Sequence, residues 1–204
     1  RASGVFGGSV RPTLEVLANQ LAVAVANAEA VRRLEAMATT DGLTGCLNKR
    51  AFLEELERKL RAAQRFGTKL SLLVTDIDHF KSVNDTYGHA TGDVVIKELG
   101  ALLRRAKRET DVVARFGGEE FCVLCEQTDT DGAVLLAERI REELGATVFP
   151  TEIGKLQVTC SLGVATFPDH AGDAAELFEI TDRALYAAKH GGRNQVVAMP
   201  SRAA

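Results

Sequence analysis

The pattern of apolar and polar positions divides the chain into a helical N-terminal segment and a mixed region. From Thr13 onward, apolar residues recur every three or four positions, which is the spacing of one helix face. They are Leu14, Leu17, Leu21, Ala24, Ala28 and Val31. This narrow stripe of leucines and small residues fits either a seam between two paired helices or packing against the chain's own domain. Glu35 breaks the pattern, and the helix runs towards a breaker, Thr-Thr-Asp-Gly at 39–42.

The positions that follow alternate between helix and strand patterns, and their order predicts the fold class. Asn48 can cap a helix over 49–66, and a nearly continuous apolar run over 70–75 is typical of a buried central strand. After these come a polar loop over 80–92, a helix that Asp93 opens, strands over 111–116 and 119–126, a helix over 131–144, a strand over 156–164, a helix from Asp173 to His190 and a strand over 193–197. The βαββαβ order predicts an α+β, ferredoxin-like core with a mostly antiparallel sheet and helices on one face, preceded by the long N-terminal helix.

The stretch 114–121 (Ala-Arg-Phe-Gly-Gly-Glu-Glu-Phe) places two acids directly after a bend. Gly117 and Gly118 separate two strand patterns, and a two-residue Gly-Gly loop predicts a tight hairpin turn with positive φ angles. Glu119 and Glu120 follow, where a strand normally favours β-branched or aromatic residues. Two interpretations fit this stretch: an ordinary hairpin with solvated acids at its tip, or carboxylates that hold a metal ion against a phosphate chain.

A second pair of acids, Asp76 and Asp78, follows the predicted buried strand, where a carboxylate without a partner is costly. We expect the end of this strand beside the glycine turn, because the first strand should neighbour the strand that follows the first crossover helix. Asp76, Asp78, Glu119 and Glu120 would then form a cluster of oxygen ligands suited to Mg²⁺ or Mn²⁺. Two such ions about 4 Å apart would activate an attacking hydroxyl and bind a leaving group.

Composition and charge narrow the class of ligand. The chain has 204 residues and a formal net charge of −3, which argues against nucleic-acid binding driven by bulk positive charge. A local cationic pocket remains compatible with that charge, and Lys81, Lys189 and Arg193 are available for a triphosphate. Cys122 and Cys125 would face opposite sides of a strand, which favours buried free thiols in a reducing cytoplasm over a zinc site. The chain contains no run of about 18 apolar residues, which is the pattern that would indicate a membrane span.

Seven short motifs stand in one order along the chain. They are Asp41-Gly-Leu-Thr44, Asp76-Ile-Asp-His-Phe-Lys81, Asn84-Asp-Thr-Tyr-Gly-His89, Gly92-Asp93, Arg115-Phe-Gly-Gly-Glu-Glu-Phe121, Tyr186-Ala-Ala-Lys189 and Gly192-Arg-Asn194. Together, over about residues 39–198, they resemble the GGDEF family of diguanylate cyclases, with Glu119 where the family name has Asp. The resemblance implies a nucleotidyl-cyclase, palm-like form of the predicted fold. It also implies the reaction, in which two GTP become cyclic di-GMP and two pyrophosphates.

The resemblance implies a role for each acid. Asp76, the Ile77 carbonyl and Glu119 would bind metal, with Glu120 assisting, and two Mg²⁺ or Mn²⁺ ions would occupy each active site. Glu119 would also help to deprotonate the ribose 3′-hydroxyl. Catalysis is therefore expected from Glu119, Asp76 and Glu120.

The substrate contacts implied by the resemblance surround these acids. Asn84 and Asp93 would read the guanine edge, and Asp93 would favour GTP over ATP. The other contacts are Phe80, Lys81, Lys189 and Arg193 at the phosphates, His89 near the ribose or base, and Gly117 and Gly118 under the nucleotide, where a Cβ would clash.

The symmetry of the product implies a homodimer. Each 3′-hydroxyl must attack the α-phosphorus of the other nucleotide, so two domains that each hold one GTP would face each other across a two-fold axis. Residues 1–38 would be a leader and a signalling or coiled-coil helix that pairs the two chains, and 14–28 resembles the closing helix of a GAF sensor domain. Residues 39–199 would be the catalytic domain and 200–204 a tail.

One further motif implies regulation. Arg108-Glu-Thr-Asp111 matches the RxxD product-inhibition site of the family, and Arg139 would add a contact from the next helix. The alternative interpretation is an arginine favoured by the helix dipole, followed by an aspartate in a turn.

Two other functions stay open at this point: a catalytically silent GGDEF receptor that binds cyclic di-GMP or GTP, and a related polymerase-like or nucleotidyl cyclase enzyme. The retained signature acids favour turnover, and the segment 80–93 argues against the second alternative. We expect a cytoplasmic location and no contact with nucleic acid or membrane for this fragment, although upstream segments of a longer protein could tether it to a membrane.

Overall fold

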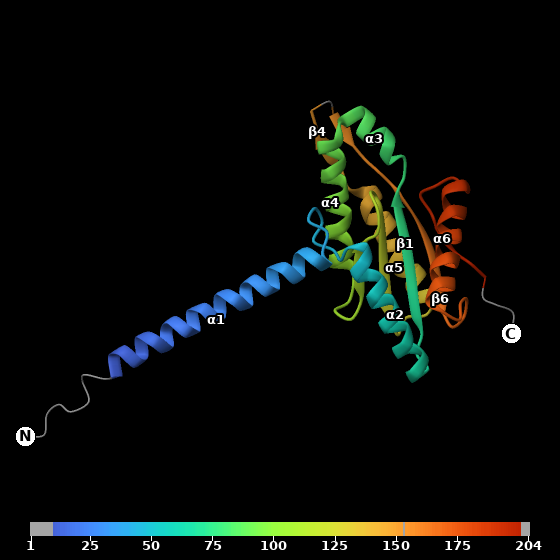
Figure 1. The fold of residues 1–204 in the computed structure, drawn as a ribbon. Coiled ribbons are helices and arrows are strands. Elements are labelled where there is room, and N and C mark those ends of the chain that lie inside the picture. The colour runs from blue at the N-terminus through green and yellow to red at the C-terminus, as the bar shows by residue number, and fades with distance from the viewer. Residues whose placement is uncertain (1–9, 153, 201–204) are drawn as a thin grey trace, which may run out of the picture. The chain divides into compact units, whose positions relative to one another are not determined.

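The computed structural model describes residues 10–152 and 154–200, which fall into two units (Figure 1). The first unit contains the helix α1 (Val10–Thr39), and the second begins at Thr40. Leu14, Leu17 and Leu21 of α1 are 58%, 54% and 66% exposed, so this part of the apolar stripe lies open to solvent. Among the described helices, none combines the length and apolar character needed to cross a membrane.

A five-stranded sheet in the order β2-β3-β1-β6-β7 forms the centre of the second unit. Its strands are β1 (Leu70–Ile77), β2 (Val112–Arg115), β3 (Glu120–Glu126), β6 (Cys160–Phe167) and β7 (Val196–Ala198). β1 pairs antiparallel with β3 on one side and with β6 on the other, whereas β7 runs parallel to β6. The expected pairing of β1 with the strand after the first crossover helix is wrong, because that strand, β2, lies at the sheet edge. The second hairpin strand, β3, is the neighbour of β1.

Helices cover both faces of the sheet, which corrects the expectation of one covered face. They are α2 (Lys49–Phe66), α4 (His89–Ala106), α5 (Thr130–Ala146) and α6 (Ala174–His190). Leu73 and Ile77 of β1 pack in one core with α4 and α5, and Leu72 and Val74 pack in a second core with α2 and α6. The element order misled here because α2 and α6 lie outside the βαββαβ unit. The α+β class and the mostly antiparallel sheet are confirmed.

The segment expected to be a polar loop over 80–92 is helical. It contains α3 (Phe80–Tyr87) and the first turn of α4. Phe80 and Val83, one helical turn apart, are buried, so a largely polar sequence conceals a short amphipathic helix. Asp93 consequently lies in the second turn of α4 and does not open that helix.

The alternating run over 156–164 does not form one strand. Its start belongs to a separate two-stranded sheet, in which β4 (Phe149–Thr151) pairs with β5 (Gly154–Leu156), and β6 begins only at Cys160. Leu156 and Val158 are nevertheless buried in the same core as β6. The alternation of apolar and polar residues therefore reflects which side chains are buried, although the segment is not one continuous strand.

The cysteines are buried free thiols, as predicted. Cys122 and Cys125 pack in different cores, on opposite faces of β3. Burial raises the pKa of Cys125 and of Cys160 to about 12, so neither thiol ionises near neutral pH.

Candidate functional site

The loop between β2 and β3 is held by its own backbone and by Arg115. The amides of Phe116 and Gly117 donate to the Glu120 carbonyl at 2.8 and 3.3 Å, and Arg115 donates from Nε and NH2 to the Gly118 carbonyl at 2.9 and 2.8 Å. The expectation of positive φ angles at Gly117 and Gly118 is wrong, because neither residue adopts them. A Cβ at Gly117 would lie 2.9 Å from Glu120 Oε2, so this carboxylate, at the end of a flexible side chain, would have to shift.

Four of the predicted site residues meet at the end of the sheet that carries this loop. Asp76 of β1 and Glu120 of β3 are register partners, and Glu119 directly precedes β3. Lys189 of α6 reaches the same point, where its Nζ lies 2.7 Å from Asp76 Oδ2. The Asp76 side chain is only 10% exposed and that of Lys189 is 30% exposed. The structure thus places one buried carboxylate between an ammonium group and two further acids.

The environment of Asp76 disfavours its charge. Burial raises its pKa from 3.8 to about 6, and the carboxylates of Glu119 and Glu120 add to the rise, while Lys189 opposes it. Because an opposite charge lowers the pKa of a buried acid, a further cation at this point would stabilise the ionised form. A strongly shifted acid next to other acids is typical of functional sites.

Asp78 does not join these acids, so the predicted four-acid cluster is wrong. Its Oδ1 accepts from Ser161 Oγ and its Oδ2 from Thr159 Oγ1, both at 2.7 Å, and Oδ2 also accepts from the Asn194 amide at 3.0 Å. These three donors satisfy a carboxylate that is 5% exposed. Asp78 is a structural acceptor at the edge of the site.

The other oxygen atoms of the site suit a hard divalent cation as metal ligands. The carboxylates of Asp76, Glu119 and Glu120 and the main-chain carbonyl of Ile77 all offer oxygen, which Mg²⁺ and Mn²⁺ prefer. Within the described residues, no three His, Cys, Asp or Glu side chains converge as a ready-made metal site. Mg²⁺ commonly takes only one or two carboxylates from a protein and fills its other coordination positions with water and phosphate oxygens.

The corner between α3 and α4 holds a buried amide that needs a partner. Asn84 Oδ1 is buried and accepts no hydrogen bond in the described structure. A Cβ at Gly92 would clash with this oxygen and would lie 3.0 Å from the Phe80 ring. Glycine at 92 therefore leaves the room that Asn84 occupies, and an unsatisfied buried acceptor points to an absent donor.

Other predicted contact residues border this corner. The side chains of Lys81, His89 and Asp93 are exposed. The Phe80 side chain is 8% exposed and belongs to the core, so Phe80 can contact a ligand only through its main chain at the start of α3.

The turn after α6 has an unusual backbone. Gly192, Arg193 and Asn194 have φ angles of 118°, 61° and 46°. Glycine adopts such angles freely and asparagine tolerates them, whereas an arginine in this region costs about 1–2 kcal/mol. The side chain of Arg193 is exposed, while its amide donates to the Ala188 carbonyl at 3.1 Å. The unfavourable backbone conformation therefore belongs to a turn whose arginine side chain is exposed.

Sequence reasoning left Arg115 and Asp41 without a role. Arg115 NH1 lies 3.2 Å from Asp41 Oδ2, and Asp41 Oδ1 accepts from the Thr44 amide and hydroxyl at 2.9 and 2.7 Å. This bridge joins the loop over 116–119 to the turn at the start of the domain. Both residues belong to motifs quoted above, but the sequence alone does not show that charged residues of two different motifs form an ion pair.

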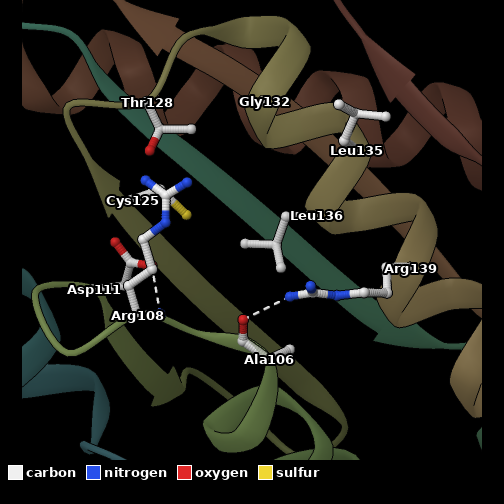
Figure 2. A pocket seen from close by; sticks show the side chains of 9 residues that line it. All are labelled: Ala106, Arg108, Asp111, Cys125, Thr128, Gly132, Leu135, Leu136 and Arg139. Atoms are coloured by element: carbon white, nitrogen blue, oxygen red, sulfur yellow. Dashed lines mark hydrogen bonds between the residues drawn. The ribbon is translucent and has the colours of Figure 1, made fainter.

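A pocket of about 330 Å³ lies between the turn before β2 and helix α5 (Figure 2). Arg108, Asp111 and Arg139 all line it, so the structure brings the three predicted residues together. Asp111 is buried and accepts from the Arg108 amide at 2.9 Å and the Glu126 amide at 3.3 Å. Arg139 NH2 donates to a main-chain carbonyl at the end of α4 at 2.7 Å, and the Arg108 guanidinium reaches towards Thr128. Two cations beside one buried acid suit an anionic ligand that also offers donors.

Comparison with known protein families identifies the family of this chain. The family described as diguanylate cyclase, GGDEF domain, matches residues 38–195. The chain belongs to this GGDEF family. That match includes every acid, cation and glycine described above.

Relatives of this GGDEF chain include curated diguanylate cyclases. It is 44% identical over 160 residues to diguanylate cyclase DgcP of Pseudomonas aeruginosa, covering 78% of this chain and 24% of DgcP. It is 37% identical over 186 residues to diguanylate cyclase A of Treponema denticola, covering 90% of this chain and 49% of that protein. The chain thus spans about a quarter and about half of the lengths of these relatives, 24% and 49%.

A solved GGDEF structure shares the fold. The coiled coil and GGDEF domain of DgcB from Caulobacter crescentus, in complex with c-di-GMP, matches with a TM-score of 0.83 and 35% sequence identity. The match covers 92% of this chain and 100% of the DgcB chain. The predicted palm-like GGDEF fold is thereby confirmed.

Proposed function

We propose that this GGDEF domain is a diguanylate cyclase that condenses two GTP into cyclic di-GMP and two pyrophosphates. The observation that carries the proposal is the buried Asp76 carboxylate, whose pKa is raised to about 6 beside Glu119, Glu120 and Lys189. A carboxylate kept in so unfavourable a place is explained by a cationic reaction partner. The curated relatives and the family match support the same reaction.

Divalent metal ions complete this site. Asp76, the Ile77 carbonyl and Glu119 would hold two Mg²⁺ or Mn²⁺ ions, with Glu120 assisting, and membership of the family implies such a dependence. When bound, these ions favour ionisation of the attacking hydroxyl and neutralise the charge of the departing pyrophosphate.

The chain's own residues move the proton and hold the phosphates. Glu119 takes the proton of the 3′-hydroxyl, whose oxygen then attacks the α-phosphorus of the other GTP. A new P–O bond forms there, and the bond to the bridging oxygen of pyrophosphate breaks. Lys189, Arg193 and Lys81 hold the phosphates with their cationic side chains, and the main chain of Phe80 adds an amide at the start of α3. Lys189 can serve Asp76 and a phosphate together, since an ammonium group has three donors.

Asn84 and Asp93 read the base. Guanine presents a carbonyl oxygen and two N–H groups on this edge, and the unsatisfied Asn84 Oδ1 needs a donor of this kind. The Asp93 carboxylate accepts only, so it selects the N–H groups of guanine over the acceptor nitrogen of adenine. His89 lies beside the ribose or base, and the Gly117-Gly118 backbone passes under the nucleotide.

One such site holds one GTP, so the reaction needs two domains. In the proposed homodimer, the facing domains each present a 3′-hydroxyl to the other's α-phosphorus. The exposed leucines of α1 supply a seam for the second chain, and the solved DgcB structure includes a coiled coil before its GGDEF domain.

Removal of residues 1–38 is expected to weaken the dimer and to lower turnover about tenfold or more at nanomolar to micromolar protein, because the second domain is then supplied only by diffusion. The measurement is initial rate against protein concentration, together with mass from sedimentation. Turnover of the truncated chain should rise with its concentration. A truncated chain that is equally active and equally dimeric at low concentration would show that α1 has no pairing role.

The pocket of Figure 2 is the proposed site of product inhibition. Arg108 and Arg139 would bind phosphate and guanine acceptors of cyclic di-GMP, and the Asp111 carboxylate would accept from a guanine edge. The solved DgcB structure is a complex with c-di-GMP, which supports binding of this product by a GGDEF domain of the same fold.

Replacing Arg108 by alanine is expected to raise the concentration of cyclic di-GMP needed for half-inhibition about 10- to 100-fold, the effect of losing a charge-assisted contact. The fold should persist, because Asp111 bonds to the Arg108 main chain and not to its side chain. Inhibition curves at fixed GTP measure the effect, with Arg61→Ala on the exposed face of α2 as the matched control. Unchanged product sensitivity in Arg108→Ala would show that this pocket is not the site of product inhibition.

The proposed reaction is tested by identifying the nucleotide products that the purified chain forms from GTP and Mg²⁺. Formation of cyclic di-GMP with two pyrophosphates per product supports it. A chain that binds GTP and leaves it intact would instead be a receptor.

A further inference from the structure

The turn that carries Arg193 cannot hold its shape through local preference. Arg193 and Asn194 both have positive φ angles, 61° and 46°, directly after Gly192 at 118°. Left alone, an arginine leaves this region for a more favourable one. Contacts from outside the turn must therefore keep it in place.

Asp78 supplies the first of these contacts. Its Oδ2 accepts from the Asn194 amide at 3.0 Å, while its Oδ1 is fixed by Ser161 Oγ at 2.7 Å. Its own amide donates to the Thr159 carbonyl at 2.9 Å. The carboxylate is thus immobile, and its bond to the main chain of Asn194 sets the position of the residue that follows Arg193.

Arg141 of α5 supplies the second contact. Its NH1 donates to Asn194 Oδ1 at 3.0 Å, and its Nε lies 2.6 Å from Glu138 Oε2. Glu142 lies 3.6 Å from the same guanidinium, whose side chain is 21% exposed. Two acids on its own helix therefore orient the guanidinium through Nε and NH2, which leaves NH1 to face the turn. Asn194 thus forms a hydrogen bond through its main chain with Asp78 and another through its side chain with Arg141.

We propose that Asp78 and Arg141 are positioning residues, which clamp Asn194 so that Arg193 stays aimed at the substrate phosphates. The clamp explains why Asp78, directly after β1, is buried without joining the acidic site, and why Arg193 has a left-handed backbone conformation. It rests on the proposed role of Arg193 in binding GTP. Neither Asp78 nor Arg141 contacts substrate in this assignment.

Kinetics of Arg141→Met test the clamp. The KM for GTP is expected to rise about three- to tenfold with kcat changed less than about twofold, because binding geometry is lost while the reacting groups stay in place. In an Asn194→Gly background, which removes the acceptor and permits the positive φ, Arg141→Met should have no further effect. Arg105→Met is the matched control, since Arg105 also bridges two acids, Glu98 and Glu143, without touching the turn. Equal effects of Arg141→Met in both backgrounds would overturn the clamp.

Limited trypsin digestion tests the same clamp without relying on activity. Trypsin cleaves after arginine, so release of the turn is expected to speed cleavage after Arg193 at least about fivefold in Arg141→Met, with cleavage after Arg65 unchanged. Mass spectrometry of early fragments gives the two rates. No acceleration after Arg193 would overturn the inference whatever the turnover. Absence of cyclase activity in the wild type would overturn the proposed function, and the digestion would still decide the clamp.

Discussion

Replacing Asp76 by asparagine is expected to abolish cyclic di-GMP synthesis and, in metal-free buffer near neutral pH, to make the folded domain more stable. The folded pKa of Asp76 is about 6, against 3.8 without the surrounding protein, so the folded state binds this proton more tightly than the unfolded state does. Stability contributed by the protonated acid is complete below pH 3.8 and is lost as the pH rises to about 6. At 1.36 kcal/mol per pKa unit, the ionised carboxylate costs roughly 3 kcal/mol above that range.

A neutral amide avoids most of this cost but loses the ion pair with Lys189, so the expected gain in the free energy of unfolding is about 1–3 kcal/mol near pH 7.5. Urea unfolding with a chelator present measures it. The difference between variant and wild type should shrink as the pH falls towards about 4, where wild-type Asp76 is itself neutral. Asp182→Asn, an exposed carboxylate on α6, is the control and should change neither stability nor turnover. A destabilised Asp76→Asn near neutral pH would mean that this carboxylate is structural.

Replacing Glu119 by glutamine is expected to lower turnover about 10²- to 10⁴-fold, the contribution typical of a general base, while GTP still binds. Glutamine keeps the size of the side chain and removes the base. Glu119 lies in the half-buried loop before β3, and its carboxylate has no ion pair or hydrogen bond within the described residues, so the fold does not depend on its charge. Rates at saturating GTP and equilibrium binding of a non-hydrolysable GTP analogue separate chemistry from binding.

The fold control for Glu119→Gln is the pocket of Figure 2, which lies apart from this loop. The variant should bind cyclic di-GMP with the wild-type dissociation constant and unfold at the wild-type temperature. Retention of more than about a tenth of wild-type turnover would exclude Glu119 as the base.

Much of the fold was predictable because local patterns and long-range packing agree in it. The continuous apolar run became β1, buried on both faces, and Asn48 accepts from the Ala51 amide as a helix cap while Gly67 ends α2 in the left-handed conformation. α3 escaped prediction because only Phe80 and Val83 mark its buried side. The order of the strands in the sheet was also not predicted, since the sequence pattern does not show which strand of the hairpin pairs with β1.

The candidate site divides in the same way. Asp76, Glu120 and Lys189 belong to motifs on separate elements, and the family resemblance located them. The strand register explains why Asp76 and Glu120 meet, and the ion pair with Asp76 brings Lys189 of α6 to the same point. The role of Asp78 was wrong because its acceptors are filled by β6 and the turn after α6. Arg141 carries no recognisable motif, and only the folded chain shows that it reaches Asn194.

Reasons for individual glycines also required the structure. Gly117 was expected to have a positive φ and does not adopt one, whereas glycine at 92 leaves room for the Asn84 side chain. The space at Gly92 is set by side chains of the preceding helix, α3. A close approach of this kind has no local sequence pattern.

The most direct test of the central claim is the identity of the nucleotides that the purified chain makes from GTP and Mg²⁺, with Asp76→Asn as the inactive control. GTP is expected to disappear with release of two pyrophosphates for each cyclic di-GMP, at a rate per chain that rises with protein concentration until the dimer is saturated. ATP should not replace GTP. GTP that is bound by the wild-type chain and recovered intact, with no cyclic di-GMP at any protein concentration, would contradict the account.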